Sequence, residues 1–239
     1  MSTSTQTVRD IAISNPASVR VFEKYGIDYC CGGRVPLSQA CETKGLSVDE
    51  VLASVEAAIA PLQPGQKDWR RESLTDLATH IVETHHAYVV RETPRLNQLA
   101  ARVVSRHGDT RAELPIIQSK LAELTEELIT HQGKEEVVLF PFIQKLERYA
   151  AGDAARPRSC FGSIDHPITM MTQDHDYAGK LIAEIRDLSQ DYAPPAGACP
   201  TFRAFYSGLQ EFEQDLHQHI HLENNILFPR ALSLEASTV

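Results

Sequence analysis

The stretch His219–Pro229, with the sequence HIHLENNILFP, has a near copy at His131–Pro141, HQGKEEVVLFP. Both copies follow the pattern H-x-x-x-E-x-x-[VI]-L-F-P. In an α-helix, a His and a Glu four residues apart lie about 40° apart around the axis and therefore on one face. Each copy can direct an imidazole and a carboxylate at one point, and this ligand pair suits borderline and hard metal ions.

A single His/Glu pair at this spacing is usually a contact on a helix surface. Here the helical wheel places apolar residues in the same arc as each pair, so both pairs are predicted to face a core. These residues are Ile117, Leu121, Leu124, Leu128, Val138, Leu139 and Phe142 in the first copy, and Phe205, Leu209, Phe212, Leu216, Ile226 and Leu227 in the second. Buried ionisable groups are costly unless they are paired or bound to a metal. The same wheels direct Glu136, His217 and His221 towards solvent.

The bulk composition is that of an ordinary soluble protein, with 239 residues of which 42% are hydrophobic and 23% charged. A net charge of -9 argues against nucleic acid or an anionic membrane as a partner. Residues 1–10 lack the basic and apolar regions of a secretory signal peptide. No apolar run is long enough to span a bilayer, so we expect a cytoplasmic location. Five cysteines predict thiols rather than a disulfide framework.

The first part of the chain is predicted to be a small helical domain, residues 1–60, with short helices over 8–12, 17–25, 37–44 and 48–59. Residues 61–68, PLQPGQKD, are typical of a linker.

The notable stretch of this domain is Asp28–Gly33, DYCCGG. Cys30 and Cys31 are either small buried apolar residues or a reactive thiol pair in a glycine-bounded loop, and the second interpretation is favoured. Cys41, Cys160 and Cys199 are isolated and receive no role.

Residues 69–239 contain four long helical patterns, over 74–105, 112–150, 168–190 and 201–231, and no pattern with the alternation of a β-strand. Four helices of this length with modest connections predict an all-α protein whose main part is an antiparallel four-helix bundle. Pro94, Pro141 and Pro229 predict kinks or early stops in these helices.

Two further histidines complete the candidate site. His175 shares its arc with apolar residues, whereas periodicity alone leaves both His85 and His86 open. The repeat selects His86, because it precedes His131 by 45 residues and His175 precedes His219 by 44. Each half then contributes two histidines and one glutamate. Three other histidines are expected to be structural or solvated: His80 on a polar face, and His107 and His166 in loops.

Four imidazoles and two carboxylates are too many ligands for one tetrahedral zinc ion, so we expect two metal ions. Glu135 and Glu223 would bridge them. Iron is the expected metal for nitrogen and oxygen ligands of this kind, and manganese is the second choice.

The motifs together resemble the repair-of-iron-centres proteins of the YtfE/ScdA type over nearly the whole chain. The resemblance rests on Tyr29–Gly33 (YCCGG), the two His/Glu motifs and Leu222–Pro229 (LENNILFP). It implies a double-cysteine domain joined to a hemerythrin-like bundle, with Cys30 and Cys31 as redox or iron-transfer groups. The implied ligands of a carboxylate-bridged di-iron centre are His86, His131, Glu135, His175, His219 and Glu223.

This resemblance implies repair of iron-sulfur clusters damaged by nitrosative or oxidative stress, with iron donated to iron-sulfur proteins as acceptors. An iron donor need not turn over a substrate. Two alternatives use the same site: reduction or scavenging of nitric oxide, and sensing of nitric oxide or oxygen. A metal-free helical scaffold is a third. The sequence is also compatible with a homodimer.

Overall fold

The computed structural model describes residues 6–58 and 67–238. In these ranges the regular secondary structure is helical, and the one β-type pairing is an isolated bridge between Thr7 and Pro36. The predicted all-α class is therefore confirmed. The predicted linker lies largely outside the described residues, and the division at residues 60 and 69 stays a prediction.

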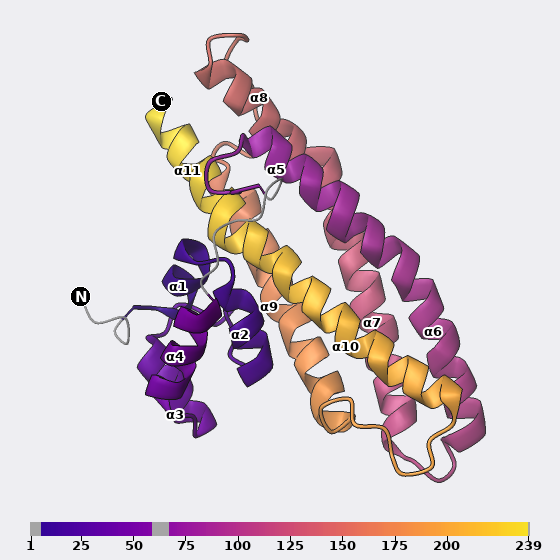
Figure 1. The fold of residues 1–239 in the computed structure, drawn as a ribbon. Helices are drawn as coiled ribbons and strands as arrows, with labels where there is room; N and C mark the ends of the chain where they lie inside the picture. The colour runs from indigo at the N-terminus through magenta and orange to yellow at the C-terminus, as the bar shows by residue number, and fades with distance from the viewer. Residues whose placement is uncertain (1–5, 59–66, 239) are drawn as a thin grey trace.

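The main body consists of four long helical rods, each antiparallel to its neighbours in the bundle (Figure 1). Three rods contain a π-helical segment, labelled η. In chain order the elements are α5 (Leu74–Ile81), η2 (Val82–His86), α6 (Ala87–His107), α7 (Glu113–Lys134), η3 (Glu135–Leu139), α8 (Phe140–Ala150), α9 (Asp165–Leu188), α10 (Pro200–His221), η4 (Leu222–Leu227) and α11 (Phe228–Ser237). The four rods are, in order, α5–η2–α6, α7–η3–α8, α9 and α10–η4–α11. The predicted four-helix bundle is confirmed.

The helix ends and the prolines differ in detail from the prediction. His107 is the last residue of α6 and His166 lies in the first turn of α9, so neither is in a loop. Such shifts arise because sequence patterns define helix ends poorly. None of the three prolines stops a rod. Pro94 lies inside α6, whereas Pro141 and Pro229 occupy the first turn after a π segment, where a missing N–H is tolerated.

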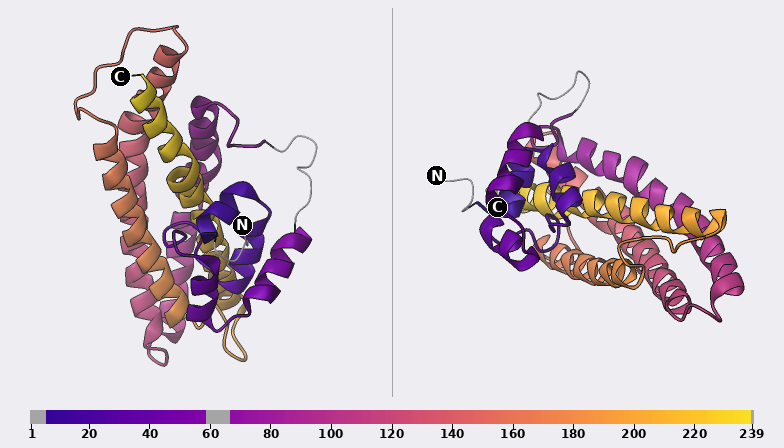
Figure 2. Two further views of the ribbon diagram at one scale, coloured as in Figure 1. Left: turned by 90° about the vertical axis from the view of Figure 1, so that its left-hand side faces the viewer. Right: turned by 60° about the horizontal axis from the view of Figure 1, so that its bottom comes forward.

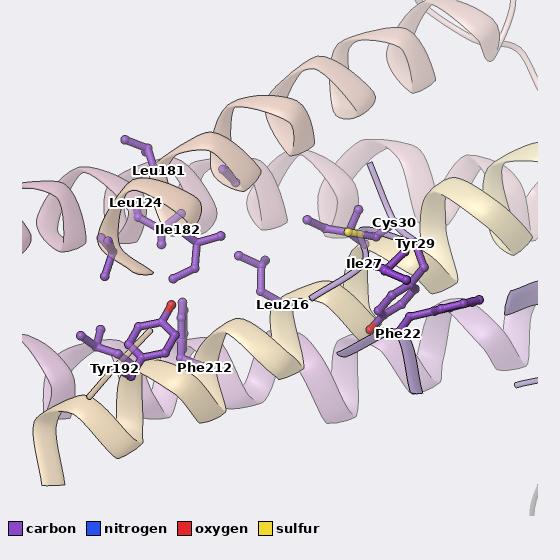
Figure 3. Packing of buried hydrophobic residues seen from close by; sticks show 14 of the residues in the cluster. Phe22, Ile27, Tyr29, Cys30, Leu124, Leu181, Ile182, Tyr192, Phe212 and Leu216 are labelled. Atoms are coloured by element: carbon purple, nitrogen blue, oxygen red, sulfur yellow. The ribbon is translucent and has the colours of Figure 1, made fainter. Parts of the chain in front are cut away.

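The N-terminal part forms four short helices, α1 (Val8–Ser14), α2 (Ser18–Tyr25), α3 (Leu37–Lys44) and α4 (Val48–Ala58). Gly26 and Gly45 end α2 and α3 in the left-handed conformation, with φ of 63° and 65°. These helices pack beside the C-terminal half of the bundle (Figures 1 and 2). One hydrophobic cluster runs through both parts, and it includes Phe22 and Tyr29 of the N-terminal part and Leu216 of α10 (Figure 3).

A second hydrophobic cluster fills the other end of the bundle, around α5, α8 and α11. Along every rod, a buried histidine lies between residues of the first cluster and residues of the second. On the second rod, for example, His131 and Glu135 lie between Leu128 and Leu139. The histidines and glutamates therefore form a polar layer that separates two apolar compartments.

The predicted core positions are buried, with one exception in the motif itself. Val138 was predicted to face the core, but it is 42% exposed. It lies in η3, and a π-helical turn holds more residues than an α-helical one. The direction of its side chain therefore departs from a wheel drawn with α-helical geometry.

Candidate metal centre

Six predicted site residues converge at the centre of the bundle, and each is at most 3% exposed. Glu135 Oε2 lies 3.4 Å from His86 Nε2 and 3.3 Å from His131 Nε2. Glu223 lies 3.0 Å from His175 Nε2 and 2.9 Å from His219 Nε2. Residues from four different rods therefore present their donor atoms to one small buried volume.

The six side chains form two groups of four, and both groups contain Glu135 and Glu223. One group adds His86 and His219, and the other adds His131 and His175. Within each group the donor atoms lie within 4.8 Å of one another, a size suited to a single metal ion. Each group combines one histidine from each half of the repeat, so both halves are needed to form either one.

The local backbone at these residues is unusual. His86 lies in η2, Glu135 begins η3 and Glu223 lies in η4. In both motif copies the histidine lies in the last turn of an α-helix and the glutamate lies in the π-helical segment that follows. π-Helical turns are rare and occur frequently at functional sites.

Burial and ion pairing act in opposite directions on the histidines. Burial lowers the pKa of His86, but its interactions with the nearby carboxylates of Glu135 and Glu223 outweigh this effect and raise that pKa to about 10. Burial also lowers the pKa of His131, but the charge of Glu135 helps to raise it to about 9. For Glu223, the neighbouring imidazoles overcome the effect of burial and hold the carboxyl pKa well below its usual range. Burial and the charge of Glu223 raise the pKa of Glu135, but His131 and His86 outweigh them and lower it, so both carboxylates are held in the charged form.

The donor set fits metal ions. Glu135 Oε1 and Oε2, Glu223 Oε2 and His219 Nδ1 are buried, and none has a hydrogen-bond partner among the described residues. A buried carboxylate oxygen without a hydrogen bond is destabilising, typically by about 1–3 kcal/mol. Cations between the two glutamates would satisfy these oxygens, and two carboxylates with four imidazoles provide the ligand types that iron or manganese uses.

The outer nitrogens of three histidines have acceptors that the sequence analysis missed. His86 Nδ1 is 2.8 Å from Glu136 Oε1, His175 Nδ1 is 2.9 Å from Asn224 Oδ1, and His131 Nδ1 is 3.3 Å from Asp174 Oδ2. Such contacts fix the orientation and tautomer of metal-binding histidines. The repeat contained a signal for two of them, because Glu136 and Asn224 each directly follow the motif glutamate.

The prediction that Glu136 points away from the site needs correction. Its side chain is 43% exposed, but its carboxylate reaches the outer nitrogen of His86 on the neighbouring rod. A helical wheel describes one helix and does not include groups on the next one. Glu136 is therefore a solvent-facing residue that also contacts the site.

His85, the other candidate at this position, lies outside both groups. Its Nδ1 is 3.0 Å from Asp215 Oδ1, and its ring is parallel to that of His219 with centroids 5.6 Å apart. His85 therefore packs against a site histidine, whereas His86 points its Nε2 into the cluster. Of the two histidines, only His86 belongs to a four-residue group among the described residues.

His217 and His221 were predicted to face solvent, and this was wrong. His221 is 6% exposed, and His217 is partly buried. Both rings pack against Tyr29, with centroids 5.4 Å away for His221 and 6.2 Å for His217. The two histidines do face away from the bundle core, but the N-terminal helices cover that face. His80 is partly buried and stacks on Trp69 with centroids 4.3 Å apart.

The cysteine loop docks on the bundle next to the histidine cluster. Cys31 Sγ lies 3.8 Å from the backbone oxygen of His175, and Asn225 Nδ2 donates a hydrogen bond of 2.9 Å to Tyr29 O. Gly179 of α9 lies at this contact, because a Cβ there would be at van der Waals distance, 3.4 Å, from Cys31 Sγ. The loop thus contacts both α9, which carries His175, and η4, which carries Glu223.

Cys30 and Cys31 differ in their surroundings although their sulfurs are 3.7 Å apart. Cys30 is buried, and its hydrogen bond with Cys31 together with burial raises its pKa well above the ordinary range. Cys31 is partly exposed. A thiol with a raised pKa is a poor nucleophile, so any chemistry of the pair begins more readily at Cys31.

Alkylation should show this difference. At neutral pH we expect exposed Cys160 to react first and Cys31 next, while Cys30 stays unmodified in the folded protein. Because the pKa of Cys30 is raised, its thiolate fraction and its labelling rate should increase only as the pH becomes alkaline. Iodoacetamide labelling followed by peptide mass spectrometry measures this order. Rapid modification of Cys30 at pH 7 would contradict the buried placement.

Comparison with known proteins gives matches to both the N-terminal part and the bundle. Residues 4–59 match ScdA_N, a domain of unknown function (DUF542), and residues 77–231 match the Hemerythrin HHE cation binding domain. A probable iron-sulfur cluster repair protein of Haemophilus influenzae is 38% identical, over 98% of this chain and 99% of its own. The iron-sulfur cluster repair proteins YtfE of Pectobacterium carotovorum and Salmonella paratyphi B are also 38% identical, over at least 95% of each chain.

The chain belongs to the YtfE family of iron-sulfur cluster repair proteins. The hemerythrin match covers all six residues of the buried cluster, and the ScdA_N match covers Cys30 and Cys31. The buried cluster and the cation-binding domain together indicate a metal-binding protein of the YtfE family. In the described ranges, no helix combines the length and apolarity that crossing a membrane requires.

Proposed function

We propose that this protein repairs iron-sulfur clusters damaged by nitrosative or oxidative stress and does so by donating iron. The observation that carries the proposal is the pair of four-residue groups sharing Glu135 and Glu223. Curated relatives over nearly the full length are named iron-sulfur cluster repair proteins, which supports iron as the metal. The acceptors would be iron-sulfur proteins, and the expected location is the cytoplasm.

In this proposal one iron ion is held by His86, His219 and the two glutamates, and a second by His131, His175 and the same glutamates. The carboxylates of Glu135 and Glu223 would offset part of the positive charge of both ions, which would lie in a layer shielded from solvent. Carboxylate and imidazole ligands bind metal only when deprotonated, so protons can compete with the ions for these groups. The iron is cargo, and the bundle is a carrier that holds it reversibly.

The cysteine loop is proposed to assist transfer by a redox or iron-binding step. Its support is the contact between Cys31 and the backbone of His175, which brings a partly exposed thiol next to the helix of a proposed ligand. Thiolates are good ligands for iron and good reductants, and a carrier that only bound oxygen would have no use for them.

A second candidate function is the binding or reduction of nitric oxide at the same site. Its support is that each four-residue group offers one ligand atom per residue. Iron commonly accepts six ligands, so positions remain for a small molecule such as nitric oxide or oxygen. A sensor or scavenger of these gases would use the same positions.

A repair assay separates these functions. Protein loaded anaerobically with iron should restore activity to an aconitase-type enzyme whose cluster has been damaged by nitric oxide, and metal analysis should give about two irons per chain. The same protein with nitric oxide and an excess of reductant should form nitrous oxide at most in stoichiometric amount. Sustained nitrous oxide production without restored enzyme activity would favour the second function over the first.

A further inference from the structure

We propose that the two metal positions differ in affinity and that one of them releases its iron first. Position 1 is defined by His86 and His219, and position 2 by His131 and His175; both include Glu135 and Glu223. Position 1 is the donor position, and position 2 retains its metal. This inference rests on the proposed function, because it concerns which iron is donated.

In position 2 both histidines are held by outer acceptors. His131 contacts Asp174, and His175 contacts Asn224. Asp174 is itself fixed by Lys134, whose Nζ lies 3.0 Å from Oδ2. Lys134 and Asp174 lie on neighbouring rods, so this network joins α7 to α9 beside the site. The cysteine loop adds support on the same side, because it contacts the backbone of His175.

In position 1 one of the two histidines has such an acceptor. His86 contacts Glu136, whose side chain is 43% exposed, and among the described residues no lysine or arginine pairs with this carboxylate. His219 Nδ1 is buried and has no hydrogen-bond partner in the described part of the chain. Its ring is held instead by stacking on His85. Stacking restrains the ring plane but does not fix which nitrogen carries the proton.

The other surroundings of the two positions are closely matched. Phe140 stacks on His86 with centroids 5.8 Å apart, and Phe228 stacks on His175 at 6.1 Å. These phenylalanines are the equivalent residues of the two motif copies. The two glutamates are common to both positions. The difference therefore lies in the outer hydrogen bonds, and one missing partner lowers metal affinity by about 10- to 100-fold.

Glu136, Asp174 and Asn224 are thus positioning residues that act through the histidines. Glu136 also provides a route for exchange, since an exposed carboxylate can leave His86 and let its ring turn away from the metal. The corresponding change at position 2 requires breaking the Asp174–Lys134 pair. The thiols lie on the side of the retained metal, which fits a redox role for them better than a direct path for the departing iron.

The test is competition between the full-length protein and a colorimetric chelator for ferrous iron under anaerobic conditions. The unmodified protein should give up two irons in two steps that differ in affinity by about 10- to 100-fold. Glu136→Leu should weaken the weaker step by a further factor of about 10 to 100 and leave the tighter step unchanged. Asp174→Leu should weaken the tighter step, so that the two steps approach each other.

Two further variants control the experiment. Glu136→Gln keeps an acceptor oxygen and should restore most of the affinity lost in Glu136→Leu. Glu127→Leu removes an exposed carboxylate from α7, on the same rod, and should leave both steps unchanged.

The outcomes separate this inference from the proposed function. The inference would be overturned if both irons were released in a single step, or if both leucine variants shifted the same step. The proposed function as an iron donor would survive either result. A shift of the tighter step by Glu136→Leu would reverse the assignment and overturn it too. Failure of the protein to bind ferrous iron would overturn the proposed function itself.

Discussion

Replacing Glu135 with leucine should remove both metal ions and abolish cluster repair. Glu135 is fully buried and belongs to both four-residue groups, so its loss leaves each position with two imidazoles and one carboxylate. Removing a direct ligand should weaken each position by more than the roughly 10- to 100-fold that loss of an outer partner causes. Iron content per chain, measured after gel filtration, should fall from about two to nearly none.

The bundle should survive this change. Leucine fills the slot of a buried glutamate with an apolar group, which avoids the desolvation penalty of an uncompensated charge. Far-ultraviolet circular dichroism should therefore show unchanged helix content. Glu127→Leu, on the same rod, serves as the matched control and should keep its iron and its repair activity. If Glu135→Leu retained two irons, the shared carboxylate would not be a ligand and the proposed centre would be wrong.

Replacing Cys30 and Cys31 together with serine should separate iron storage from iron delivery. Neither sulfur belongs to the four-residue groups, so the variant should still bind about two irons. Repair of a damaged acceptor should fall to the level seen without protein, because serine hydroxyls neither exchange electrons nor bind iron as thiolates do. The two measurements to compare are bound iron and recovered acceptor activity.

A loss of repair could also follow from local misfolding, because burying a serine hydroxyl in place of a thiol costs about 1–3 kcal/mol. Unchanged resistance of residues 28–33 to limited proteolysis in the double variant would exclude this explanation. Cys160→Ser changes an exposed thiol far from the loop in sequence and should leave repair unaffected. Full repair by the double variant would remove the thiols from the proposed mechanism.

Much of this protein could be predicted from local sequence patterns. The helical repeat of apolar residues gave the four rods, since one period of the α-helix fixes which residues share a face. The duplicated motif identified His131, Glu135, His219 and Glu223, and the matching spacing added His86 and His175. All six converge in the structure.

The helical-wheel predictions were wrong where the backbone is not α-helical or where another helix packs on the face concerned. Val138 is exposed because a π-helical segment interrupts the α-helical period. His217 and His221 are covered because a separate group of helices packs on a face that the bundle alone would leave open. Glu136 reaches the site because its partner lies on another rod.

The sequence by itself determined the helices and the chemical identity of the buried cluster, because both depend on spacing within single helices. The tertiary structure decided which histidines share a group, which outer acceptors hold them, and where the cysteine loop rests. Each of these depends on the packing of rods that are distant along the chain. His86 therefore pairs with His219, 133 positions away, and not with His131 of its own half.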